Sequence, residues 1–177
     1  MVNLLPIDKT EKIQTVMPMP SEKDSWNDLQ ILFATKNGNV RRNQLNDFVN
    51  IRQNGKIAMK LHNDDELVSV QPCNASDNFF LATRLGKAIR CDINDVRIFV
   101  GRDSSGVRGI KLKPSDYVVS MSIVNPDIKQ YVLSVTENGF GKRTIVGDYR
   151  VTNRGGQGVA NIECSDRNGP VVSSYIV

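Results

Sequence analysis

The sequence predicts an all-β chain built from a repeated unit of four short strands. Runs of about four to eight residues, rich in Val, Ile, Thr and aromatic residues, alternate with turns of Gly, Asn and Asp. No stretch of about ten or more residues keeps the 3.6-residue apolar period of a helix. Related segments also return about every 50 residues, and four strands per unit of that length are typical of a propeller blade.

Four landmark segments define the unit, and each of them occurs three times in the same order. The first ends in a turn, where Asn37-Gly38 and Asn138-Gly139 favour a hairpin. The second has the pattern apolar, any residue, Asp, large apolar; the third starts at a glycine and alternates; the fourth is Val-rich. We expect all four to be strand-like, at 32–38, 80–86 and 132–139; 45–48, 93–96 and 146–149; 55–61, 106–112 and 158–164; and 66–70, 117–121 and 170–174.

The landmarks divide residues 1–177 into parts of one β-domain. Residues 29–73, 78–124 and 129–177 are predicted to be successive blades, and residues 1–20, which fit only the last two landmarks, to be the tail of another blade. This makes about three and a half repeats. Because closed propellers have about four to eight blades, we expect the array to continue in at least one direction.

Residue usage argues against catalysis by this chain. One histidine, His62, and three cysteines, Cys73, Cys91 and Cys164, have neither metal-ligand nor redox spacing. The segment 139–144 resembles a phosphate loop only faintly, because position 136 is Thr where the nucleotide-binding signature needs Gly. The sequence also has no apolar stretch approaching the roughly 20 residues of a membrane span. We therefore expect no catalytic residue, metal site, cofactor or small-molecule substrate.

The charge is positive and uneven. The net charge is +4; residues 1–30 carry three Lys against five acids (−2), and residues 31–177 carry twenty Lys or Arg against fourteen acids (+6). A basic excess favours a polyanionic partner, although charge alone does not identify one.

The basic residues recur at matching positions of the repeat. Counted back from the landmark aspartates, Arg42, Arg90 and Arg143 are equivalent. Since equivalent positions of stacked repeats lie on one side, we expect a curved stripe that binds phosphates, and the lack of recurring aromatic neighbours favours duplex DNA over single strands. The candidate DNA-binding residues are Arg41, Arg42, Arg52, Lys60, Lys87, Arg90, Arg102, Arg108, Lys111, Lys142, Arg143 and Arg154.

Several segments resemble the C-terminal domain of bacterial DNA gyrase A. They are 2–7, 34–38, 106–112 and 137–144, and the similarity extends over essentially the whole chain, in order. The resemblance implies a six-bladed β-pinwheel, whose blades exchange a strand and whose basic outer rim wraps duplex DNA. In that family, wrapping presents DNA with a fixed crossing sign, so that ATP-driven strand passage introduces negative supercoils.

The resemblance also implies a parent enzyme, an ATP-dependent topoisomerase of the bacterial cytoplasm and nucleoid. Its catalytic residues, ATP and Mg²⁺ lie on other domains, and gyrase B joins it in an A2B2 heterotetramer. The family's signature box, approximately QRRGGKG, is not in the sequence. Residues 153–158 are only a degenerate echo with Gln157 at a basic position, so the role of the box is not transferred to them.

Two alternatives stay open. The chain is also similar to the C-terminal domain of the corresponding topoisomerase IV protein, whose blades are usually more degenerate. A propeller-like scaffold could instead bind proteins through its strand edges, with the basic stripe serving solubility.

Overall fold

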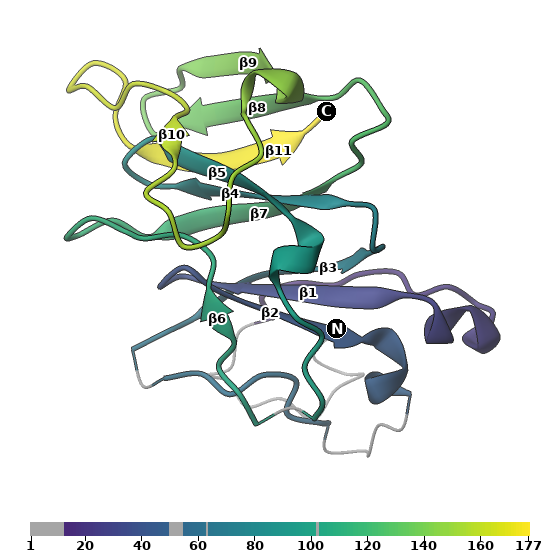
Figure 1. Ribbon diagram of the computed structural model, residues 1–177. Coiled ribbons are helices and arrows are strands. Elements are labelled where there is room, and N and C mark those ends of the chain that lie inside the picture. Colours follow the sequence, from purple (N-terminus) through teal and green to yellow (C-terminus); the bar gives the residue numbers. More distant parts are fainter. Residues whose placement is uncertain (1–12, 50–54, 63, 102) are drawn as a thin grey trace.

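Three antiparallel β-sheets stack on one another in the computed structural model (Figure 1). The structure describes residues 13–49, 55–62, 64–101 and 103–177. We call the sheets blades 1, 2 and 3 in chain order, and the described residues outside them form short 3₁₀ turns and connections.

Each blade has a central hairpin flanked by a third strand of the same repeat. In blade 1 these are β1 (Gln30–Thr35), β2 (Asn39–Gln44) and β3 (Leu67–Cys73). In blade 2 they are β4 (Asn78–Thr83), β5 (Lys87–Asp92) and β7 (Val118–Val124). In blade 3 they are β8 (Tyr131–Thr136), β9 (Gly141–Ile145) and β11 (Val171–Ile176). The all-β blade architecture predicted from the sequence is confirmed.

The fourth strand of a blade comes from the following repeat. β6 (Val107–Arg108) pairs with β2 of blade 1, and β10 (Val159–Ala160) pairs with β5 of blade 2. The expected longer strands at the third landmark are therefore wrong in extent, and the segment 55–61 forms no strand. These segments must bend from one blade to the next, so only two residues keep ladder geometry. Within the described residues blade 3 has three strands, with β9 at its outer edge.

The second landmark forms 3₁₀ turns and no strands, which corrects the expectation. The turns are η2 (Leu45–Phe48), η3 (Ile93–Asp95) and η4 (Val146–Asp148); a further turn, η1 (Lys23–Asn27), precedes blade 1. The first residue of each of η2, η3 and η4 is buried, and the chain turns there to leave the sheet. The apolar-x-Asp-apolar pattern thus marks the exit from a blade.

Glycines allow the exchanged segments to approach the preceding blade. A Cβ added at Gly106 would lie 2.3 Å from the carbonyl oxygen of Val40, and one at Gly158 would lie 2.4 Å from that of Ala88. Both glycines have positive φ, of 85° and 70°. A side chain at either position would therefore push the exchanged strand off the blade.

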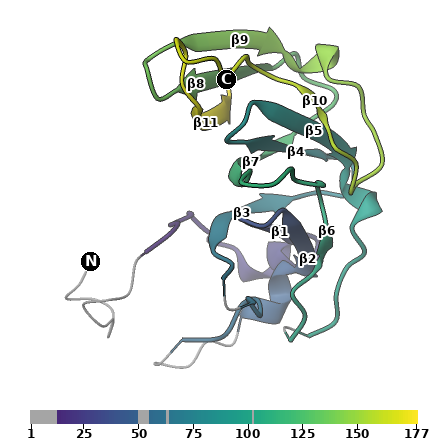
Figure 2. The ribbon, with the colours of Figure 1, turned by 90° about the vertical axis from the view of Figure 1, so that its left-hand side faces the viewer.

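The blades pack through both faces of the central hairpin. Phe79 and Leu81 of β4 are buried against blade 1, whereas Phe80 and Ala82 face blade 3. Inner strands pack together, because β7 contacts both β3 and β11, and the Gln71 side chain donates to Met121 O at 3.2 Å. The exchanged segments cross on the opposite side, seen at the right in Figure 2. We call these segments, together with the outer strands β2, β5 and β9 of the three blades, the outer rim.

Candidate nucleic-acid interface

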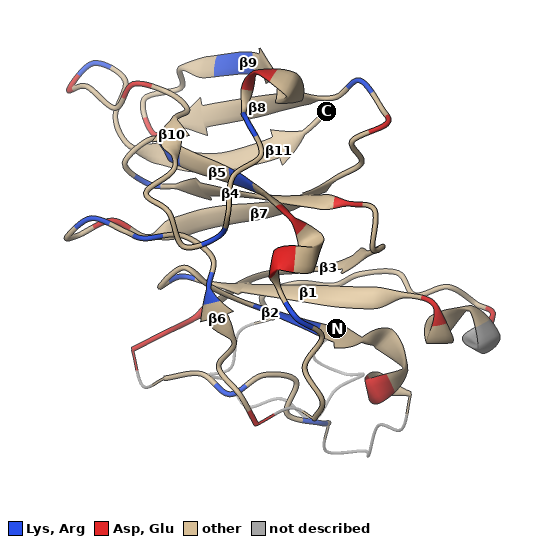
Figure 3. Ribbon diagram, in the orientation of Figure 1, with Lys and Arg blue, Asp and Glu red and all other residues tan. Residues whose placement is uncertain are grey.

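The three arginines that the repeat aligns occupy one structural position. Strand pairing places Arg42 opposite Leu32, Arg90 opposite Phe80 and Arg143 opposite Leu133. Figure 3 shows Lys or Arg on β2, β5 and β9 at all three levels of the stack. The sequence therefore aligned these residues correctly.

Arg42 and Arg90 nevertheless join blades together. Arg42 is 5% exposed, and its Nη1 donates to Gln30 and Asn94 side-chain oxygens at 3.2 Å each. Arg90 is half-buried; its Nε donates to Asn78 Oδ1 at 2.8 Å, and its Nη1 donates to Val146 O at 3.2 Å. Burial lowers the pKa of both guanidinium groups. The expectation of one exposed stripe is wrong for Arg42 and only partly met by Arg90.

Arg143 is exposed, because no following unit covers its face of blade 3 within the described chain. Its guanidinium stacks over the Tyr131 ring at 4.7 Å from the centroid. The same repeat position therefore provides two arginines that donate hydrogen bonds to the next repeat, Arg42 and Arg90, and one exposed cation, Arg143.

Arg41 lies in the interior, against the expectation that it contributes to the stripe. It is 0% exposed, and its guanidinium donates to the carbonyl oxygens of Gly101 and Ser104. It closes the segment that precedes β6 together with Asn43, whose Nδ2 also donates to Gly101 O at 2.9 Å. These carbonyls lie outside the strand ladder and are satisfied by side-chain donors.

The other candidates divide into exposed and partly buried groups. Arg154 is half-buried, and its Nε donates to Asp95 O at 2.8 Å, so it ties its own loop to the preceding turn. Lys87 is also half-buried. Arg52 and Arg102 lie outside the described residues. The exposed candidates are Lys60, Arg108, Lys111 and Lys142.

Sequence reasoning missed two exposed cations on the outer rim. Arg97 and Arg150 each follow a landmark aspartate by two residues, after Asp95 and Asp148. The recurrence two residues after the landmark aspartate was a usable signal, but the predicted stripe included only the strand before each landmark and the segments around the third landmark, and it left this position out.

Exposed rim cations are not neutralised by neighbouring acids. Among the described residues, the ion pairs are Lys36–Glu66 at 3.0 Å and Arg84–Glu137 at 3.5 Å, both of which involve β-hairpin turns. No described carboxylate therefore pairs with the exposed set Arg108, Lys111, Lys142 and Arg143, which we call the rim cations. These charges are available to a polyanion.

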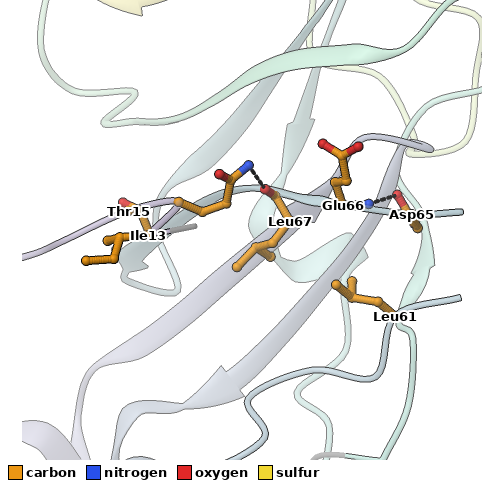
Figure 4. Close-up of a pocket in the computed structure, with 7 residues that line it drawn as sticks. Ile13, Thr15, Leu61, Asp65, Glu66 and Leu67 are labelled. Atoms are coloured by element: carbon orange, nitrogen blue, oxygen red, sulfur yellow. Dashed lines mark hydrogen bonds between the residues drawn. The ribbon is translucent and has the colours of Figure 1, made fainter. Parts of the chain in front are cut away.

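An open pocket beside β3 does not suit an anion. Apolar and acidic residues, among them Leu61, Asp65, Glu66 and Leu67, line it (Figure 4). The Gln14 side chain is also part of the lining and donates to Leu67 O at 2.9 Å. Its carboxylates would repel phosphate.

A metal site and a membrane-spanning helix each have requirements that the described residues can meet or fail. No group of three His, Cys, Asp or Glu residues could hold a metal among these residues, and no helix there is long and apolar enough to cross a membrane. Burial raises the pKa of Cys73 and of Cys91 to about 12, so both thiols stay protonated and unreactive at neutral pH.

Consecutive blades joined by exchanged strands define the class of this protein, a β-propeller-type repeat domain with a basic outer rim. A family model described as the DNA gyrase C-terminal domain, beta-propeller, matches residues 30–74, 77–125 and 130–176. The chain belongs to this family.

Named relatives agree with the family assignment. DNA gyrase A of Rickettsia bellii is 36% identical over an alignment of 218 positions, gaps included, which covers 97% of the chain and 24% of that protein. DNA gyrase A of Staphylococcus epidermidis is 37% identical over 174 residues, which cover 97% of the chain and 19% of that protein. The chain thus spans about a quarter of these relatives or less.

Two solved structures share the fold throughout the chain. The C-terminal domain of DNA topoisomerase IV superposes with a TM-score of 0.88 at 27% identity, covering 99% of this chain and 54% of that one. The DNA gyrase A C-terminal domain gives a TM-score of 0.83 at 28% identity, covering 99% and 57%. The chain therefore corresponds to a little over half of either solved domain.

Proposed function

We propose that the chain binds duplex DNA along its outer rim and bends it. In a parent DNA gyrase, this wrapping would present DNA to the cleavage core so that negative supercoils are introduced with ATP. The parent would work with gyrase B, in the bacterial cytoplasm, and this chain would contribute no catalytic group.

The observation that carries the proposal is the unpaired charge of the rim. Arg108 and Lys111 come from the exchanged segment of repeat two, and Lys142 and Arg143 come from the outer strand of blade 3. All four are exposed, and none forms an ion pair with a described carboxylate. Cations spread over successive blades suit phosphates spread along a backbone.

The free-energy cost of bending DNA determines how many phosphate contacts the rim must make. Smooth bending of a short duplex costs on the order of 1–6 kcal/mol, so several phosphate contacts are needed to offset it. Each contact releases counterions, and binding should consequently weaken steeply as salt rises.

The test is fluorescence anisotropy with a plain duplex over a series of salt concentrations. We expect the variant with Arg108, Lys111, Lys142 and Arg143 all changed to Gln to bind more weakly, with a log–log salt slope smaller in magnitude by about 3 to 4. As a matched control, Lys36→Gln should cost less affinity than Lys142→Gln on the rim, because the Lys36 ammonium is already paired with Glu66 at 3.0 Å. Salt-independent binding, or unchanged binding by the fourfold variant, would exclude the rim as the DNA site.

The structural similarity to topoisomerase IV supports a second parent enzyme. A supercoiling assay of the full-length protein with its partner protein separates the two. Negative supercoils introduced into a relaxed plasmid support gyrase, and DNA binding without this activity supports topoisomerase IV.

A further inference from the structure

A pocket on the outer rim lies beside the glycine-rich loop 153–158. Its volume is about 270 Å³, and its lining includes Arg90, Arg150, Asn153 and the loop residues 156–158. No carboxylate is among the lining residues. The pocket is therefore positively charged, and the apolar residues Ala88, Ile89 and Val159 form part of its wall.

The equivalent loop of the preceding repeat is closed by a side chain. There, Arg41 reaches from β2 to the carbonyls of Gly101 and Ser104. The residue at the matching position of β5 is Ile89, directly before Arg90, and a Cβ placed on Gly156 would lie 3.7 Å from its Cδ1. Isoleucine cannot donate hydrogen bonds to the loop, so the space that Arg41 fills in one repeat is open in the next.

Hydrogen bonds to the preceding repeat hold the loop 153–158 in place. Gly155 N donates to Gly109 O at 2.6 Å, and Arg154 Nη1 donates to Arg108 O at 3.1 Å. The Asp95 carboxylate accepts the backbone N–H of Arg154 at 3.3 Å, on the side of the preceding turn. Little ordering of the backbone is then needed when a ligand binds.

Several donors of the loop and pocket are unused. The backbone N–H groups of Gly156, Gln157 and Gly158 donate to no described residue, and neither does Nη2 of Arg90. Arg150 is exposed and forms no ion pair with a described acid. Successive free N–H groups beside a guanidinium form the type of concavity that binds anionic oxygens.

We propose that this pocket binds one phosphodiester group of duplex DNA, through Arg150 and the amides of residues 156–158. The inference rests on the proposed function and adds a fixed contact point to the diffuse rim charge. Such a contact sets the position of the duplex on the rim without reading its sequence.

The experiment follows the backbone amide NMR signals of Gly156, Gln157 and Gly158. The protein is titrated with a short duplex and, separately, with inorganic phosphate. We expect the duplex to shift these three signals, and Arg150→Gln to abolish the shifts and weaken binding about tenfold. Arg97→Gln is the matched control, because Arg97 occupies the equivalent position beside the loop that Arg41 closes; it should weaken binding only about twofold, through general charge.

Gly156→Ala tests the pocket without changing charge. The added methyl group meets nothing closer than 3.7 Å, so the fold should be retained while the pocket becomes smaller. We expect several-fold weaker duplex binding with an unchanged thermal midpoint.

Four results would overturn the proposal. Duplex binding without shifts at residues 156–158, or equal effects of Arg150→Gln and Arg97→Gln, would reject the pocket and leave rim binding intact. Shifts caused by inorganic phosphate but not by the duplex would show a site for free anions only. Absence of any duplex binding by the unmodified chain would reject the proposed function itself.

Discussion

Arginine at one repeat position has two roles, and its neighbours determine which. Arg90 donates to the carbonyl oxygens of Val146 and Tyr149 in the following repeat, whereas the guanidinium of the exposed Arg143 stacks over the Tyr131 ring. A buried guanidinium without its acceptors would be costly, and an exposed one is free to bind phosphate. Variants at the two positions should therefore fail in different ways.

Arg90→Ala should destabilise the fold. The substitution removes the Arg90 donor from Asn78 Oδ1 and Tyr149 O, and it removes one of the two donors to Val146 O, which keeps the bond from Tyr149 N. Unsatisfied buried groups cost about 1–3 kcal/mol. Urea unfolding followed by circular dichroism should show a loss of about 2 kcal/mol.

Arg143→Ala is the comparison for that measurement. It should change the free energy of unfolding by less than about 0.5 kcal/mol and weaken duplex binding instead. Equal losses of stability in the two variants would contradict the assignment of separate roles.

The buried thiols make stability depend on alkaline pH. Burial raises the pKa of Cys73 and Cys91 from 9.0 to about 12, so only the unfolded chain loses these protons near pH 9. The free energy of unfolding should be unaffected by these groups below about pH 9 and should fall as pH rises from there towards 12. Urea midpoints at about pH 7 and about pH 10.5 measure the effect.

Cys91→Ala controls for other alkaline titrations. The variant should be less stable than the parent chain at about pH 7, because it leaves a cavity, yet its stability should fall less steeply above about pH 9. An unchanged slope would assign the alkaline loss to other groups.

At the scale of elements, strand exchange depends on close backbone approach. β6 and β10 contribute only two residues each, so the glycines that precede them determine whether the segment can reach the blade. Ladder hydrogen bonds alone would hold such short strands weakly.

Gly158→Ala should detach β10 from β5. The new Cβ would lie 2.4 Å from Ala88 O, and the residue would also need positive φ, so we expect a loss of about 2–3 kcal/mol. Hydrogen exchange should show faster exchange at Asn161 N, which bonds Gly86 O at 2.8 Å beside this strand.

Gly139→Ala separates conformational strain from the clash. Gly139 has φ of 82° but nothing within 4 Å of an added Cβ, so only the backbone term remains, about 1 kcal/mol. A Gly158→Ala loss no larger than this would show that the close approach carries no energy.

At the scale of the whole molecule, the proposed DNA path runs along the outer rim of three stacked blades, and we expect this path to be curved. If the duplex follows this curve, part of the binding free energy is used for bending. A straight duplex lying across one blade would bind without this bending cost.

A nick at the centre of the duplex should therefore strengthen binding. Nicked DNA bends at little cost, and even about 1 kcal/mol of the bending cost saved corresponds to about fivefold in affinity. Competition between nicked and intact duplexes of equal length measures the ratio. Equal affinities would show that the duplex binds without bending.

Residue patterns predicted the all-β repeat and the alignment of Arg42, Arg90 and Arg143, because strand alternation and turn glycines are local properties. They did not predict that η2, η3 and η4 are turns, since an apolar-x-Asp-apolar segment of four residues fits either structure. The basic residues were found, but their burial depends on contacts with repeats about 50 positions away.

Local patterns in the sequence account for the repeat, the excess of basic residues and the family to which the chain belongs. Tertiary structure decided which cations are exposed: Arg41 is inside a loop, Arg42 is between blades, and Arg143 is at the surface. It also decided that the loop near Arg150 holds an open pocket, because Ile89 replaces the arginine that closes the equivalent loop. Whether a basic side chain is exposed depends on the residues that the neighbouring blade packs against it. The sequence of a single repeat does not contain those residues.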